Sequence, residues 1–173
     1  LQVLHDIHLD ILGSRSSQEI AQAAIRHVQS LIPCRRVSIA VVDVPRARAE
    51  LIALRDDEST TEPREGSIIP LDAFGSVEDL RAGVVRNVAT LGEVPRVIQA
   101  LENSGLRSFI NVPLLADGDL IGVLNVSSVE EAAFSQDAIE IAQQVASTLA
   151  VALRQAQLRE RVERYANELE DRV

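Results

Sequence analysis

The residue of this chain with the greatest capacity for covalent chemistry is its single cysteine, Cys34. Arg35 and Arg36 follow it, and nearby positive charge lowers the pKa of a thiol, as a redox-active or chromophore-binding cysteine requires. A lone cysteine between a predicted helix and a predicted strand is more often a small buried apolar residue, which is the favoured interpretation here. One cysteine forms no internal disulfide, in agreement with a reducing compartment.

The other residues capable of chemistry do not form a recognisable active site. His5 and His8 are spaced to share a helix face, but two histidines with only Asp6 or Asp10 nearby make an incomplete metal site. All seventeen basic residues are arginine, so no lysine exists for a Schiff base or a phosphate-binding loop. The sequence shows neither a nucleophile elbow with a Ser-His-Asp order nor a glycine-rich phosphate loop. We therefore expect no enzymatic activity, no cofactor and no metal site.

The amino-acid composition argues against several classes of binding partner. A net charge of −9 and an aromatic content of 2% argue against general nucleic-acid binding, which needs a basic surface and stacking platforms. No apolar run reaches the roughly 20 residues that span a bilayer, and no signal peptide opens the sequence. We expect a cytoplasmic protein that makes no membrane contact through this segment. With 173 residues, 46% of them hydrophobic, one domain with helical extensions is expected.

Hydrophobic periodicity predicts helices at both ends of the chain and strands between them. An opening helix ends at Gly13, and a second begins at Ser16, where Glu19 completes a capping box. Asp117-Gly118 predicts a tight hairpin turn between the last two strands. This order predicts an α+β fold with a central antiparallel β-sheet and helices packed on it. Short helices are expected at 77–81 and 95–103, and strands at 37–43, 50–55, 67–71, 84–88, 108–115 and 120–127. The strand at 50–55 is expected to be the hairpin partner of the strand at 37–43.

The last forty residues, Phe134 to Val173, contain neither Gly nor Pro and predict one long helix with Ser135 as its N-cap. Its first half is apolar on a stripe that suits a domain core, whereas its second half is charged apart from one seam. We expect this seam and a similar stripe on the opening helix to form a parallel homodimer. The pattern also indicates a module of a longer protein with an output domain downstream. The expected dimer residues are Leu1, Leu4, His8, Ile11, Leu158, Val162, Tyr165 and Leu169.

Three sequence segments resemble the GAF domain family. They are 106–115, the hairpin that continues into 120–126, and Phe134-Ser-Gln-Asp137 ahead of the long helix. The resemblance covers nearly the whole chain and implies a GAF/PAS-like sheet with a coiled-coil-like signalling helix. The implied organisation is an N-terminal linker helix at 1–13, a GAF-like domain at 14–153 and a helical linker or coiled coil at 154–173. It also implies a non-catalytic sensory or regulatory module of a signal-transduction protein, such as a sensor histidine kinase of a two-component system.

The resemblance further implies a pocket between one sheet face and the middle of the chain. Alternation places Phe109 and Asn111 on one face, and together with Phe74 and Arg86 they are the expected ligand-binding residues. In the competing interpretation, Phe109 belongs to the hydrophobic core and Asn111 forms a structural hydrogen bond with the backbone.

The ligand itself is not identified by the resemblance. The chain lacks the family's Asn-Lys signature for cyclic nucleotides, the Cys-His context of bilin attachment and the cysteine pair of sulfoxide reduction. The expectation is therefore a small molecule or partner of unspecified class. Two alternatives stay open: a ligand-free structural dimerisation module, and a sensor that carries a chromophore or redox cofactor.

Overall fold

The computed structural model describes residues 16–58, 63–91 and 103–172. The predicted opening helix at 1–13 and all but the end of the predicted helix at 95–103 lie outside these ranges. The described elements are α2 (Ser17–Leu31), β1 (Arg36–Asp43), β2 (Arg48–Asp56), β3 (Ile68–Pro70), the 3-10 helix η1 (Leu71–Phe74), α3 (Val77–Arg81), β4 (Arg86–Val88), β5 (Ser108–Ala116), β6 (Asp119–Ser128) and α5 (Gln136–Asp171).

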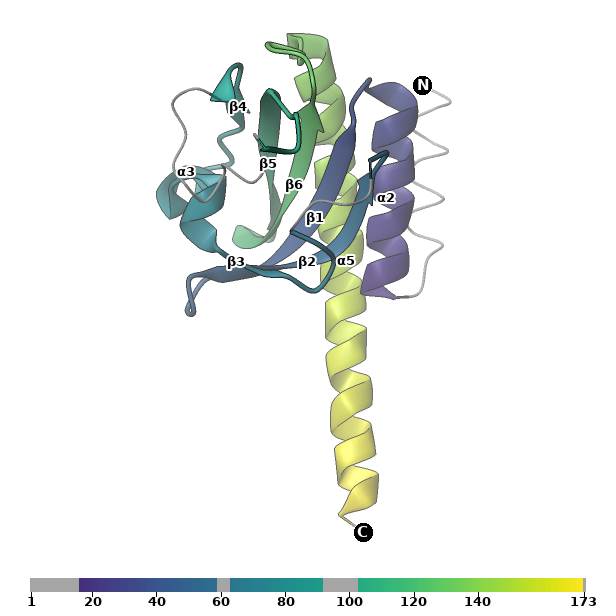
Figure 1. Ribbon diagram of the computed structural model, residues 1–173. Helices are drawn as coiled ribbons and strands as arrows, with labels where there is room; N and C mark the ends of the chain where they lie inside the picture. The colour runs from purple at the N-terminus through teal and green to yellow at the C-terminus, as the bar shows by residue number, and fades with distance from the viewer. Residues whose placement is uncertain (1–15, 59–62, 92–102, 173) are drawn as a thin grey trace.

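Within the described residues, six strands form one antiparallel sheet in the order β3-β2-β1-β6-β5-β4 (Figure 1). The predicted α+β class is therefore confirmed, and so are the two predicted hairpins, β1 with β2 and β5 with β6. The last strand, β6, lies beside the first strand, β1, so the centre of the sheet joins two distant parts of the chain.

Local sequence signals explain where the long elements begin and turn. The Ser16 hydroxyl accepts a hydrogen bond from the Glu19 N–H at 3.1 Å, and the Ser135 hydroxyl accepts one from the Ala138 N–H at 3.2 Å. Both are N-caps that satisfy an otherwise unpaired backbone donor. Asp117-Gly118 has φ values of 51° and 81°, which a two-residue hairpin turn of this hand requires.

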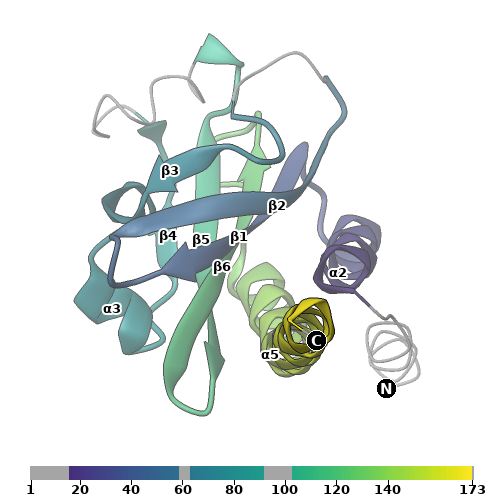
Figure 2. The same ribbon diagram turned by 90° about the horizontal axis from the view of Figure 1, so that it is seen from below.

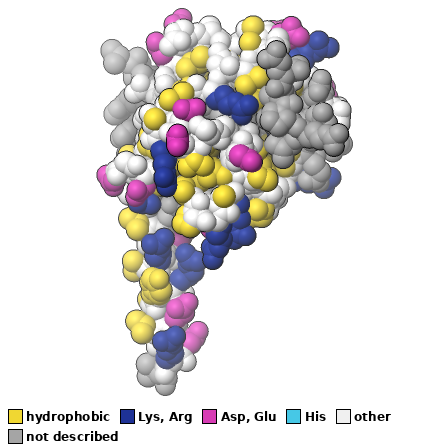
Figure 3. Space-filling model, turned by 90° about the vertical axis from the view of Figure 1, so that its left-hand side faces the viewer, with side chains coloured by type: hydrophobic (Ala, Val, Ile, Leu, Met, Phe, Trp, Pro, Cys, Tyr) yellow, Lys and Arg dark blue, Asp and Glu magenta, His cyan; other side chains and the backbone are white. Residues whose placement is uncertain are grey.

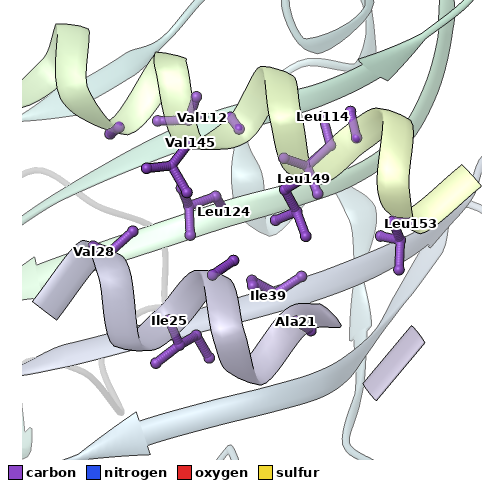
Figure 4. Packing of buried hydrophobic residues seen from close by; sticks show 14 of the residues in the cluster. Ala21, Ile25, Val28, Ile39, Val112, Leu114, Leu124, Val145, Leu149 and Leu153 are labelled. Carbon is purple, nitrogen blue, oxygen red and sulfur yellow. The ribbon is translucent and has the colours of Figure 1, made fainter. Parts of the chain in front are cut away.

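Helices α2 and α5 lie side by side on one face of the sheet, here called the helix face (Figures 1 and 2). Alternate strand residues point to this face, including Val37, Ile39, Val112 and Leu124. They pack against Ile25 and Val28 of α2 and against Val145, Leu149 and Leu153 of α5 (Figure 4). Nearly all of these side chains are fully buried, so the helix face is the main core of the domain.

The opposite side of the sheet, here called the loop face, is covered in part by η1 and α3 (Figure 2). Leu71, Phe74 and Leu80 from these short helices pack on Val123 and on other residues of the central strands. A second small apolar cluster on this face consists of Leu91, Leu106 and Phe109. The loop face thus holds two apolar clusters rather than one continuous layer.

Close packing between strands explains the glycine in β6. A Cβ atom added at Gly122 would lie 2.6 Å from the Ala40 carbonyl oxygen and 2.8 Å from Leu114 Cδ1. Backbone oxygen cannot move aside as a flexible side chain can, so this strand position accepts only glycine without local rearrangement.

Helix α5 leaves the domain after Ala156, its last buried residue. Near the point of departure, the Glu160 carboxylate accepts hydrogen bonds from the N–H and the hydroxyl of Ser17, both at 3.0 Å. This places a negative charge at the N-terminus of α2, where unpaired N–H groups and the helix dipole favour it. None of the helices in the described ranges has the length and hydrophobicity that a membrane span requires.

Candidate functional site

A row of polar side chains crosses the loop face of the sheet. Ser38 of β1, Asn125 of β6 and Asn111 of β5 are paired directly in register, and Arg86 of β4 is paired with Asn111. Directly paired residues of antiparallel strands place their side chains on the same face. The Asn111 Nδ2 donates to Asn125 Oδ1 at 2.7 Å, and the Asn125 Nδ2 donates to Ser38 Oγ at 3.2 Å. We call Ser38, Asn125, Asn111 and Arg86 the polar row.

One atom of the polar row is buried without a partner. Asn111 is 4% exposed, and its Oδ1 accepts no hydrogen bond. Leaving a buried acceptor unpaired costs about 1–3 kcal/mol. Such an atom is unusual in a folded domain and calls for an explanation, of which an absent ligand is one.

Arg86 is paired directly with Asn111 across β4 and β5. Its guanidinium carbon is 5.6 Å from the centroid of the Phe109 ring, and its Nη1 donates to the Ala73 carbonyl at 3.2 Å. The Nε and Nη2 donors have no partner among the described residues. The side chain therefore links β4 to the end of η1, on the strand next to Asn111.

The structure thus brings three of the four predicted ligand-binding residues together. Arg86, Phe109 and Asn111 are neighbours, whereas Phe74 belongs to the adjacent apolar cluster of η1 and α3. Phe74 and Phe109 are buried at 7% and 3% exposure. Sequence reasoning missed Ser38 and Asn125. Their polar character at inward positions of apolar strands was the available signal, but their alignment with Asn111 depends on the register between distant strands.

Cys34 lies at the junction of α2 and β1 and packs against the core of the helix face. Burial, followed by the negative charge of Asp57, raises the pKa of its thiol to about 11. The raised pKa argues against the alternative of a reactive thiol and agrees with the favoured interpretation of Cys34 as a small apolar residue. Its arginine neighbours do not lower the pKa, because both guanidinium groups are directed at another carboxylate. Arg35 and Arg36 bind Asp56 at 3.2 and 3.4 Å.

These two arginines hold chain segments rather than a ligand. The Arg35 guanidinium donates to the Ser104 carbonyl, and the Arg36 guanidinium donates to the Pro63 carbonyl. Both side chains are nearly buried and share the Asp56 carboxylate. The cluster therefore fastens the chain at Pro63 and at Ser104 to the start of β1.

Three further polar side chains take no part in the polar row: Arg81 and Arg107 are exposed, and His27 is half-buried on α2. The predicted dimer residues Leu1, Leu4, His8 and Ile11 lie outside the described residues, as does His5. No three of the described histidines, cysteines and carboxylates are grouped closely enough to hold a metal ion.

The predicted seam on α5 faces solvent. Leu158, Val162, Tyr165 and Leu169 are 48%, 67%, 60% and 64% exposed. Val151, one heptad before Leu158, is also exposed at 51%, so the same stripe begins alongside the domain. Sequence reasoning missed Val151 because apolar residues of this part of α5 were assigned to the core.

Comparison with solved structures supports the fold. The phycocyanobilin-bound GAF domain of a cyanobacterial phytochrome superposes with a TM-score of 0.76 and 24% identity, over 91% of this chain and 95% of that chain. The chromophore-binding domain of an unusual bacteriophytochrome from R. palustris gives 0.75 and 10% identity, over 90% and 61%. The photosensory core module of Stigmatella aurantiaca phytochrome gives 0.74 and 17% identity, over 90% and 36%.

Comparison with curated proteins finds no match. The family model of the GAF domain matches residues 16–153, which include every described strand and most of the part of α5 that packs on the sheet. The polar row, the two loop-face clusters and the main core apart from Ala156 fall within this match. The chain therefore belongs to the GAF domain family.

Proposed function

We propose that this GAF domain is a sensory module of a signal-transduction protein, such as a sensor histidine kinase, and that it transmits a ligand- or partner-dependent change through a parallel homodimer of its helices. GAF domains are generally non-catalytic sensory modules. The observation that carries the proposal is the double role of α5. Its first half is part of the core, and its second half projects from the domain with an apolar stripe exposed to water (Figure 1).

The exposed stripe supports association with a second helix. Val151, Leu158, Val162, Tyr165 and Leu169 follow the spacing of a coiled-coil seam. Burial of such side chains gives about 1.5–3 kcal/mol for each one that is fully buried, which far exceeds the contribution of surface ion pairs. A parallel arrangement would place both downstream segments on the same side of the dimer.

The polar row supports a ligand site on the loop face. A ligand there would donate a hydrogen bond to Asn111 Oδ1 and accept one from Arg86, while Phe109 supplies an apolar wall. Both polar partners sit on adjacent strands of the sheet that α5 packs against from the other side. A shift of β5 on ligand binding would therefore reach α5 through direct packing.

A ligand-free dimerisation module is the second candidate, because protein side chains alone bury Phe74 and Phe109 in apolar clusters. A bilin attached through cysteine does not fit the described residues. The only thiol packs against the helix face, away from the polar row, and its pKa is raised. Native mass spectrometry of freshly purified protein distinguishes these candidates. A retained small molecule supports the sensory proposal, and a dimer with bare-chain mass supports the structural one.

Dimer formation is tested by replacing Val162 and Leu169 together with Glu. Analytical ultracentrifugation should then show a monomer, whereas the control pair Gln143→Glu and Asn167→Glu, which adds the same charge at exposed positions off the stripe, should stay dimeric. A dimer that survives in the first variant would place the interface elsewhere. Spin labels next to Leu169 that stay far apart in an intact dimer would contradict the parallel arrangement.

A further inference from the structure

A hollowed surface lies at the base of the domain, where α5 leaves it. Two adjoining hollows of about 530 Å³ and about 300 Å³ share Val42, Leu120 and Arg154 in their walls. The end of α3 and the β5–β6 hairpin form walls of the first hollow, and the departing part of α5 forms a wall of the second. We call the two together the basal groove, which is distinct from the polar row on the loop face.

Arginine side chains surround the basal groove. Arg81 lines the first hollow, Arg161 and Arg164 line the second, and Arg154 lines both. Figure 3 shows dark-blue side chains gathered at the base of the domain beside the descending helix. Four arginines and three carboxylates, Asp43, Asp119 and Glu160, line the groove, whereas the chain as a whole has a net charge of −9.

The carboxylates of the groove are already engaged. Asp43 is paired with Arg46 at 3.1 Å, and that hydrogen bond lowers the pKa of the Asp43 carboxyl. Asp119 is paired with Arg154 at 2.6 Å, and Glu160 accepts both hydrogen bonds from Ser17.

The other three guanidinium groups of the groove are not paired in this way. The side chains of Arg81, Arg161 and Arg164 make no hydrogen bond or ion pair with any residue in the described ranges. Positive charges that line a concave surface reinforce one another's field and attract an anion. Guanidinium groups also suit phosphate oxygens, because they donate two parallel hydrogen bonds.

We infer that the basal groove is a second ligand site, which binds a small organic polyphosphate. Because the unpaired guanidinium groups are divided between two adjoining hollows, a ligand with two or more phosphate groups would offer one to each hollow. The volumes match those of small-molecule pockets, and Val42 and Leu120 give the non-phosphate part an apolar surface. The bound ligand would tie α3 to the projecting half of α5.

The inference is tested by isothermal titration calorimetry with inorganic tripolyphosphate, ADP and inorganic phosphate at one fixed low ionic strength. We expect tripolyphosphate and ADP to bind more tightly than phosphate. Arg81→Gln and Arg164→Gln should each weaken tripolyphosphate binding about tenfold, as expected for loss of a charged hydrogen bond. Arg172→Gln removes the same charge from α5 beyond the groove and should change nothing. All three arginines are exposed, so the variants should keep the wild-type thermal unfolding midpoint.

Several results would overturn the inference. Equal weakening by Arg172→Gln would reduce the effect to general electrostatics, and equal affinity for phosphate and tripolyphosphate would contradict one ligand spanning both hollows. Absence of tripolyphosphate binding would remove the site altogether. A glutamate-rich peptide that binds more tightly than tripolyphosphate would make the occupant an acidic protein segment. None of these outcomes depends on the proposed dimer or on the loop-face ligand.

Discussion

The two buried asparagines of the polar row should respond very differently to the same substitution. In Asn111→Leu, the Asn125 Oδ1 loses its donor, but the unpaired Asn111 Oδ1 disappears at the same time. Each unpaired buried group costs about 1–3 kcal/mol, so the two changes nearly cancel. The buried leucine side chain adds up to about 1 kcal/mol of stabilisation. We therefore expect the free energy of unfolding to stay within about 1 kcal/mol of the wild type.

Asn125→Leu has no such compensation. It removes both hydrogen bonds of the row, leaves Asn111 Nδ2 and Ser38 Oγ without partners, and retains the unpaired Asn111 Oδ1. Two new unpaired groups, less about 1 kcal/mol gained from leucine burial, give a loss of about 1–5 kcal/mol. The double variant, which lacks both amides, should be less destabilised than Asn125→Leu alone.

Urea unfolding at one protein concentration measures all three variants, and midpoint shifts are comparable where the denaturant slope is unchanged. The two single substitutions replace the same side chain with the same residue, so each is the volume-matched control for the other. A loss for Asn111→Leu as large as that for Asn125→Leu would refute the reasoning. Strict additivity in the double variant would also refute it, because residues that share a hydrogen bond should be coupled.

Two further predictions concern the core. The pKa of the Cys34 thiol is about 11 in the folded protein, against an ordinary value of about 9. Iodoacetamide should therefore alkylate the folded protein at pH 8 far more slowly than the urea-unfolded chain. Equal alkylation rates would show an accessible thiol with an unshifted pKa. The stabilisation linked to this thiol is fully present below about pH 9 and is lost as the pH rises toward 11. Gly122→Ala should lower the free energy of unfolding by about 1–3 kcal/mol, because the added carbon would meet the Ala40 carbonyl; an unchanged urea midpoint would contradict this.

Elements with local signals could be predicted from the sequence. Ser16 with Glu19, Ser135, and Asp117-Gly118 each act through atoms only a few residues away, and the structure confirms all three. The predicted helix at 77–81 has the observed bounds. The two hairpins followed from alternation and short connections, which fix the pairing of neighbouring strands.

The contacts between distant parts of the chain could not be predicted from the sequence. The placement of β6 beside β1, and hence the contact of Asn125 with Ser38, depends on a pairing across 87 residues of sequence. The contact of Glu160 with Ser17 spans 143 residues. A register shift after Ile39 changes which residues of β2 face each side of the sheet, and periodicity does not reveal it.

The contact between Glu160 and Ser17 also determines how far the end of the long helix moves when the helix tilts. It is the last hydrogen bond between α5 and the rest of the described domain, so the helix beyond it behaves as a lever arm pivoting on that contact. From Glu160 to Asp171 the arm is about 16 Å long at about 1.5 Å per residue. A tilt of about 10° at the pivot would therefore carry the far end sideways by about 3 Å, half the width of a side-chain row on a helix. Sub-ångström adjustments in the sheet can in this way become displacements large enough to change which residues meet across a helical interface.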